Sequence, residues 1–155
     1  MTFARRLFAK LILRLHRMRR GMTLGVRALL INDDDQVFLV KHTYMPGWYL
    51  PGGGVEPGET FHDALVKEVR EECNLALTDE GILLAILQNA RVSKRDHVAL
   101  YHCPSFEVIG PPDVPNREIQ DAKFFPIRDL PTDASPATVK RIREFLNQGP
   151  YPEIW

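Results

Sequence analysis

Residues 52–75 read GGGVEPGETFHDALVKEVREECNL, a glycine-rich loop followed directly by a segment of helical periodicity. In the helical segment, Glu68, Glu71 and Glu72 are spaced i, i+3 and i+4, which places their carboxylates on one helical face. Like charges so placed repel one another, but a hard divalent cation prefers oxygen ligands and would offset that cost. The opposite face offers apolar side chains for burial: Phe61, Ala64, Leu65 and Val69. The stretch therefore predicts a helix that packs on a core and presents carboxylates to a metal.

The same stretch resembles the signature of the Nudix hydrolases, G-x5-E-x7-R-E-U-x-E-E-x-G-U, where U is a bulky aliphatic residue. Two positions depart from it, because Lys67 replaces the arginine and Asn74 replaces the second glycine. Asn tolerates the left-handed conformation that commonly ends a helix, whereas lysine keeps the charge of arginine without its planar fork. An acidic, solvated helix face is the alternative, and the long gapless match argues against it. The matching residues are Gly53, Glu59, Glu68, Val69, Glu71, Glu72 and Leu75.

The resemblance implies a metal centre on this helix. Nudix hydrolases depend on Mg²⁺ or Mn²⁺, so the expected cofactor is one of these ions. By the match, the metal ligands are expected to be Glu68, Glu71 and Glu72, with the Gly52 carbonyl as a further ligand. Metals held by several carboxylates can bridge phosphates and lower the pKa of an attacking water.

The resemblance also implies catalytic roles. Glu59 is expected to support the carboxylate cluster, and Lys67 to pair with Glu59 as the family arginine does. The general base comes either from the signature helix or from a glutamate in a later loop, for which Glu118 is the first candidate and Glu107 the second. Either loop glutamate could instead be a surface carboxylate. The catalytic candidates are Glu71, Glu72, Glu59, Glu118 and Lys67.

The expected reaction is hydrolysis of a phosphoanhydride bond in a nucleoside diphosphate linked to another group. The partner is thus a small nucleotide-type molecule. The imperfect signature keeps an alternative open, in which the domain binds a nucleotide or regulates without hydrolysing it. Substrate-binding candidates are basic residues for phosphate and an aromatic residue for stacking a base. They are Arg27, Lys41, Trp48 and Arg91, the last in a polar stretch that could also be a solvated loop.

Composition bounds the class of protein. The 155 residues are the size of one domain, and 45% hydrophobic residues allow a sizeable core. Residues 1–20 hold seven of the 20 basic residues and no acid, so the remainder has 13 basic against 20 acidic residues. An acidic body disfavours a stable nucleic-acid partner. Cys73 and Cys103 lack metal-ligand spacing and are expected to be reduced, and we expect a cytoplasmic protein.

Residues 3–20 are expected to form a basic amphipathic helix, with residues 1–21 outside the Nudix domain at 22–155. Apart from Leu13, their apolar residues fall in one half of a helical wheel and their basic residues in the other. Such a helix could lie on an anionic membrane surface, or pack on its own domain or on a second subunit in a homodimer. An acid-free, Arg-rich start also resembles a mitochondrial transit peptide, although it contains no serine.

The remaining pattern predicts an α+β domain. Residues 23–32 and 36–42 are expected to be strands joined as a hairpin by a solvated turn at residues 33–35. Further strands are expected at residues 81–89, 97–109 and 122–126. Ser135 and Pro136 predict the start of a last helix that ends near Gly149. The resemblance sharpens this to a Nudix-like α/β/α sandwich with a mixed sheet.

Overall fold

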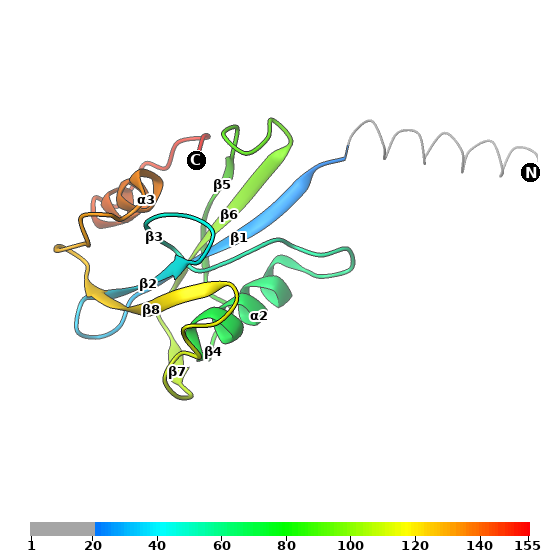
Figure 1. Cartoon of the computed structure of the whole chain (residues 1–155). Coiled ribbons are helices and arrows are strands. Elements are labelled where there is room, and N and C mark those ends of the chain that lie inside the picture. Colours follow the sequence, from blue (N-terminus) through cyan, green and yellow to red (C-terminus); the bar gives the residue numbers. More distant parts are fainter. Residues whose placement is uncertain (1–20) are drawn as a thin grey trace, which may run out of the picture.

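The computed structural model describes residues 21–155 (Figure 1). The helix expected at residues 3–20 lies outside the described residues. Among the residues described, no helix is long and apolar enough to cross a membrane. In chain order the elements are β1 (Thr23–Leu30), β2 (Gln36–His42), β3 (Trp48–Tyr49), α2 (Phe61–Cys73), β4 (Leu75–Leu77), β5 (Ile82–Gln88), β6 (Asp96–Cys103), β7 (Phe106–Val108), β8 (Ile119–Pro126) and α3 (Pro136–Leu146).

The strands form a mixed arrangement. β1 pairs in parallel with β6, and β6 pairs antiparallel with β5. β2 lies between β3 and β8 and is antiparallel to both, while β4 and β7 form a separate pair. Parallel and antiparallel neighbours therefore coexist, as the α+β prediction required.

The two helices lie on opposite sides of the strands (Figure 1) and each covers its own core. Alternation along β1 sends Val26, Ala28 and Leu30 toward α2, where they meet Leu65 and Val69. Leu29, between Ala28 and Leu30, points to the other side of the strand, toward α3. That second core contains Leu29, Leu39, Trp48, Leu87, Leu100 and Ile142. The α/β/α sandwich expected from the resemblance is confirmed.

Local signals set both ends of α2. The Thr60 side chain accepts a hydrogen bond from the Asp63 N–H, and the Asp63 side chain accepts one from the Thr60 N–H. This capping box satisfies two backbone donors at the helix start. At the other end, Asn74 adopts a left-handed conformation with φ 52° and ψ 40°. The departure from glycine at this position is therefore accommodated by the backbone.

The predicted hairpin between residues 23–32 and 36–42 is wrong. β1 and β2 share one bridge, Ile31 to Val37, and then diverge. The free edge of β1 is instead taken by the glycine-rich segment: the Val26 N–H donates to the Gly53 carbonyl and the Ala28 N–H to the Pro51 carbonyl, both at 2.9 Å. This long-range pairing places the glycine loop beside β1.

The continuous strand predicted at residues 97–109 is also wrong. Pro104 has no N–H to donate to a ladder, and the run divides there into β6 and β7. β7 leaves the sheet and pairs with β4. The last strand begins at Ile119 rather than 122, because its first residues pair with the end of β2. The last helix starts at Pro136 behind the Ser135 cap, as predicted.

Candidate functional site

Two carboxylates of α2, those of Glu68 and Glu72, lie against the glycine loop. The Gly52 N–H donates a hydrogen bond of 2.8 Å to Glu72 Oε2. At the next position, a Cβ added to Gly53 would lie 2.5 Å from Glu68 Oε1, so this carboxylate lies directly against the loop backbone. The site is thus built from one helix face and one loop, which the pairing with β1 holds in place.

Gly52 is required at its position. Its φ of +140° lies in a region that side chains rarely adopt, and an added Cβ would collide with the Val26 carbonyl oxygen. The absence of a side chain lets the loop pass between β1 and α2. This close passage is what brings the Gly52 N–H within reach of Glu72.

Burial raises the pKa of two of the glutamates. It raises the pKa of Glu72 to about 7, although the hydrogen bond from Gly52 works in the opposite direction. Burial also raises the pKa of Glu68, and Lys67 partly offsets the effect. Burial disfavours the charged form of a carboxylate, and a cation placed nearby stabilises that charged form. The structure therefore supplies groups that would bind a positive charge.

The donor set fits a hard divalent cation. Glu68, Glu71 and Glu72 offer oxygen ligands, and none of them forms a salt bridge with another residue of the region 21–155. Within that region, no three His, Cys, Asp or Glu side chains are already gathered around one point at metal-binding distance. These carboxylates are therefore available to a bound Mg²⁺, which commonly also keeps waters and takes substrate oxygens as ligands.

The contact expected between Lys67 and Glu59 is present. Lys67 Nζ donates to Glu59 Oε1 at 2.9 Å and to Oε2 at 3.1 Å, so the single ammonium reaches both oxygens. The Glu56 N–H donates to Oε2 at 2.9 Å as well. The Glu56 hydrogen bond and, after it, the Lys67 ammonium lower the pKa of Glu59. Lysine therefore holds the loop glutamate despite lacking the arginine fork.

Arg27 brings a positive charge to the loop from β1. Its Nη1 donates to the Leu50 carbonyl at 3.1 Å and to the Gly52 carbonyl. The Gly52 oxygen that the resemblance marks as a metal ligand thus already accepts a hydrogen bond, and a carbonyl oxygen has a second lone pair for another partner. Arg27 also lowers the pKa of Glu72 and Glu68 by charge attraction, after the larger effects described above.

Glu118 and His42 lie where β2 ends and β8 begins. Glu118 is exposed and directly precedes β8, and its carbonyl accepts a hydrogen bond from the Thr43 N–H at 2.9 Å. His42 packs against Tyr44 and Tyr49, whose ring centroids are 5.1 Å and 5.8 Å from its own. His42 was not among the sequence candidates. A histidine ending an apolar strand was the only signal, and such a signal is weak.

Other candidates lie elsewhere. Lys41 Nζ forms a 2.9 Å ion pair with Asp133, and Trp48 is 5% exposed in the α3-side core against Phe125. The structure therefore does not bring these two side chains to the carboxylates. Arg91 is exposed in the turn between β5 and β6.

A cavity of about 290 Å³ lies against β1 and the glycine loop. It is bounded by Gly53 and Gly54 of the loop and by Arg27, and Trp155 lines it from the chain terminus. Asn89 and Asp96 also line it, joined by a 2.9 Å hydrogen bond from Asn89 Nδ2 to Asp96 Oδ2. An aromatic ring and hydrogen-bonding side chains thus stand next to the charged site.

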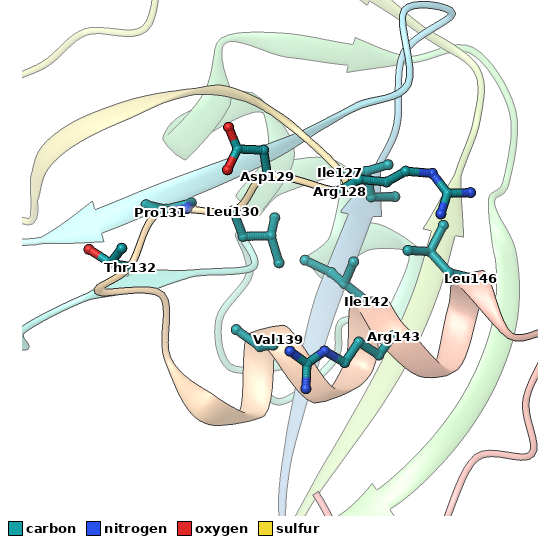
Figure 2. A pocket seen from close by; sticks show the side chains of 10 residues that line it. All are labelled: Ile127, Arg128, Asp129, Leu130, Pro131, Thr132, Val139, Ile142, Arg143 and Leu146. Carbon is teal, nitrogen blue, oxygen red and sulfur yellow. The ribbon is translucent and has the colours of Figure 1, made fainter.

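A larger cavity of about 490 Å³ lies between α3 and the loop after β8. Figure 2 shows Leu130 and Ile142 extending into it, with the guanidinium groups of Arg128 and Arg143 at its edges. Asp129 is the single acidic residue of its lining. The residues that line this cavity include neither a group of carboxylates nor a glycine loop. Although it is the larger of the two cavities, we therefore do not consider it the reaction site.

Comparison with known proteins matches the chain to the NUDIX domain over residues 21–148. An 8-oxo-dGDP phosphatase of Mus musculus is 30% identical over 145 residues, which are 89% of this chain and 44% of that protein. An RNA pyrophosphohydrolase of Legionella pneumophila (strain Corby) is 40% identical over 65 residues, or 42% of this chain and 37% of that protein. The matches span between 22% and 50% of the length of the first curated relatives.

Solved structures agree with the fold. The MutT NUDIX hydrolase from Burkholderia pseudomallei superposes with a TM-score of 0.67 at 26% identity, covering 79% of this chain and 97% of that one. A NUDIX hydrolase from Nitrosomonas europaea gives a TM-score of 0.69 at 20% identity, covering 85% and 93%. At that lower identity the likeness extends to the fold alone.

Proposed function

The chain belongs to the Nudix family, and from this premise we propose that it is a Mg²⁺- or Mn²⁺-dependent hydrolase. Its reaction would cleave a phosphoanhydride bond in a nucleoside diphosphate linked to another group. The observation that carries the proposal is the convergence of Glu68 and Glu72 on the Gly52–Gly53 backbone. A loop without side chains beside unpaired carboxylates leaves room for a metal-bound phosphate chain.

Glu68, Glu71 and Glu72 would hold the metal, with the Gly52 carbonyl as an additional oxygen ligand. When bound, the metal would neutralise phosphate charge and lower the pKa of a bound water. Lys67 and Glu59 would support this arrangement from the side of the loop. Groups that orient ligands in this way commonly contribute 10- to 100-fold to metal affinity or activity.

Arg27 and Glu118 are our candidates for binding phosphate and for activating water. Arg27 projects a guanidinium at the loop carbonyls, where it can also reach a phosphate oxygen. Glu118 is exposed and can accept a proton from water, which makes it our candidate general base. Phosphoryl transfer needs mainly positioning and charge neutralisation, and these residues supply both.

The 290 Å³ cavity beside the glycine loop suits the nucleoside. Trp155 offers a surface on which a base can stack, and Asn89 and Asp96 offer donors and acceptors for its edge. Relatives named 8-oxo-dGDP phosphatase and RNA pyrophosphohydrolase support a nucleotide as the class of substrate. We therefore place the phosphates over the loop and the base in this cavity.

A substrate panel tests the proposal. Purified protein with Mg²⁺ or Mn²⁺ would be offered nucleoside di- and triphosphates, 8-oxo-dGDP, ADP-ribose, nucleotide sugars, dinucleoside polyphosphates and triphosphorylated RNA, with product analysis. We expect metal-dependent release of phosphate or of a nucleotide from at least one class. Tight binding measured by calorimetry without any product would instead favour the binding or regulatory module.

Lys67 gives a prediction of its own. Lys67→Ala should lower turnover about 10-fold or more, because Glu59 loses the ammonium that holds both of its oxygens. The melting temperature should change little, since both side chains are partly exposed. Lys67→Arg should retain or raise turnover by restoring a planar fork. Equal turnover in all three proteins, measured at saturating Mg²⁺, would end the supporting role proposed for Lys67.

Three wider expectations remain proposals. Residues 1–20 would contact an anionic membrane surface through their seven basic residues. A homodimer is the competing arrangement for the same segment. A cytoplasmic location accords with the reduced cysteines expected from the sequence.

A further inference from the structure

Arg141 of α3 is a fully buried arginine that contacts residues 151–155, the segment that follows the helix. A buried guanidinium is costly without partners, and Nη2 finds one in Glu144 Oε1 at 2.8 Å. Nη1 donates to the Ile154 carbonyl at 3.3 Å. The guanidinium carbon also lies over the ring of Trp155, 5.5 Å from its centroid. One buried side chain thus contacts two consecutive residues of the segment.

The segment 151–155 is attached to the end of β5 as well. The Gln88 N–H donates to the Glu153 carbonyl at 2.8 Å, and the Trp155 N–H donates to the Gln88 carbonyl at 3.0 Å. Figure 1 shows the chain after α3 running back to the turn between β5 and β6, where this pairing lies. These bonds fix the backbone of Trp155 but not the direction of its side chain. Arg141, by contrast, contacts the ring itself.

The ring held in this way lines the 290 Å³ cavity beside the glycine loop. Among residues 21–155, Trp155 is the one aromatic residue in the lining of this cavity. The Asp96 carboxylate is also held in place there, because it accepts hydrogen bonds from Thr23 Oγ1 at 2.7 Å and from Asn89 Nδ2 at 2.9 Å. Arg27 lines the same cavity, which therefore joins an aromatic ring to our candidate phosphate-binding residue.

We propose that Arg141 is a positioning residue for the substrate, which holds the Trp155 ring in the orientation that stacks on the nucleotide base. The inference rests on the proposed function and adds a residue that does not itself touch the substrate. The guanidinium takes one face of the indole, so the base would stack on the opposite face. A ring already held in its bound orientation loses less freedom when the base arrives, which favours binding. Arg141 would thus raise affinity for the nucleoside and not for the phosphates.

Matched variants separate positioning from folding. Trp155→Ala removes the stacking surface, whereas Arg141→Lys keeps a positive charge for Glu144 and loses the planar guanidinium. Glu144→Gln is the control, because the amide oxygen can still accept the hydrogen bond from Arg141 and leaves its contact with Trp155 in place. Calorimetry on each full-length protein with Mg²⁺ would measure binding of the α,β-methylene analogues of ADP and GDP. Inorganic pyrophosphate serves as the probe without a nucleoside.

We expect Trp155→Ala to weaken binding of the tighter nucleotide analogue about 10-fold, since stacking on an aromatic ring is lost. Arg141→Lys should weaken it about 3-fold or more, because the ring is then free to turn. Both variants should bind pyrophosphate as the wild type does, and Glu144→Gln should bind all three probes as the wild type does.

Tryptophan fluorescence reports on the ring directly. A Trp48→Phe background leaves Trp155 as the only tryptophan of the chain. In this background, adding Arg141→Lys should move the emission to longer wavelength, because a ring that turns freely is more exposed to water. Adding Glu144→Gln should leave the emission unchanged. This measurement needs no ligand, so it tests the contact between Arg141 and Trp155 even where binding is weak.

Nucleotide binding by Trp155→Ala equal to wild type would overturn the stacking, even in a protein that hydrolyses a compound of the panel. Arg141→Lys that matches the wild type in nucleotide affinity and emission would overturn the role of Arg141. Equal weakening of nucleotide and pyrophosphate binding would also overturn it, because Arg141 would then only maintain the fold. A wild type that binds no probe and turns over no compound of the panel would overturn the proposed function, and with it this inference.

Discussion

Glu72→Gln should lower turnover by about 10²- to 10³-fold while the protein stays folded. The change removes the charge of a glutamate whose Oε2 accepts the Gly52 N–H at 2.8 Å. Its oxygen can still accept that hydrogen bond in the variant, so the loop should keep its position. What is lost is the negative charge that would bind a divalent cation. Steady-state hydrolysis of the best panel substrate, at saturating Mg²⁺, measures the effect.

A matched control separates this effect from a general loss of charge. Glu80→Gln makes the same chemical change on the exposed turn before β5, away from the glycine loop. It should turn over substrate as the wild type does. Mn²⁺ affinity should fall in Glu72→Gln and not in Glu80→Gln. Near-normal turnover by Glu72→Gln would contradict the assignment of the carboxylates as the metal site.

The sequence predicted this part of the molecule because its determinants are local. The α2 helix, its Thr60 cap and the spacing of its glutamates all lie within one short stretch. Lys67 and Glu59 are eight residues apart, so their contact followed from the helix and the loop together. Where both partners of a contact are close in sequence, periodicity and capping chemistry suffice to place them.

The other candidates depended on partners far along the chain. Lys41 bonds to Asp133, 92 positions away, and Trp48 packs on Phe125 in the α3-side core. Neither partner can be read from the neighbourhood of residues 41–48. The hairpin failed for the same reason, because the free edge of β1 is filled by the glycine loop and not by β2.

The burial of His42 could not be predicted from the sequence, because a histidine that ends an apolar strand can face either the core or the solvent. Arg27, by contrast, was a substrate candidate from the sequence. The structure adds that its guanidinium is directed at the Leu50 and Gly52 carbonyls, a detail of geometry that residue type alone does not contain.

The metal-free protein should lose stability as the pH rises from about 4.5 to about 7, through Glu72. Burial raises the pKa of this carboxyl from 4.5 to about 7 in the folded state. The folded protein then holds a proton that the unfolded chain releases, so the stabilisation is complete below about pH 4.5 and is lost as the pH passes 7. A shift of this size changes the free energy of unfolding by on the order of 3 kcal/mol between low and high pH.

Glu72→Gln isolates this contribution, because the amide does not titrate while other groups remain as they are. His42, whose pKa is lowered mainly by burial, acts in the opposite direction in both proteins and cancels in the comparison. In EDTA, urea unfolding at pH 4.5 and pH 8 should show the variant gaining roughly 3 kcal/mol relative to wild type. Mg²⁺ at millimolar concentration should reduce that gain at pH 8, because it binds the ionised wild-type carboxylate and not the amide. A difference between the two proteins that does not change with pH would show that Glu72 is not held in a charge-disfavouring site. The variant expected to lose the most activity is therefore expected to be the more stable protein at alkaline pH without metal, since the structure gives up stability to keep this carboxylate beside the loop.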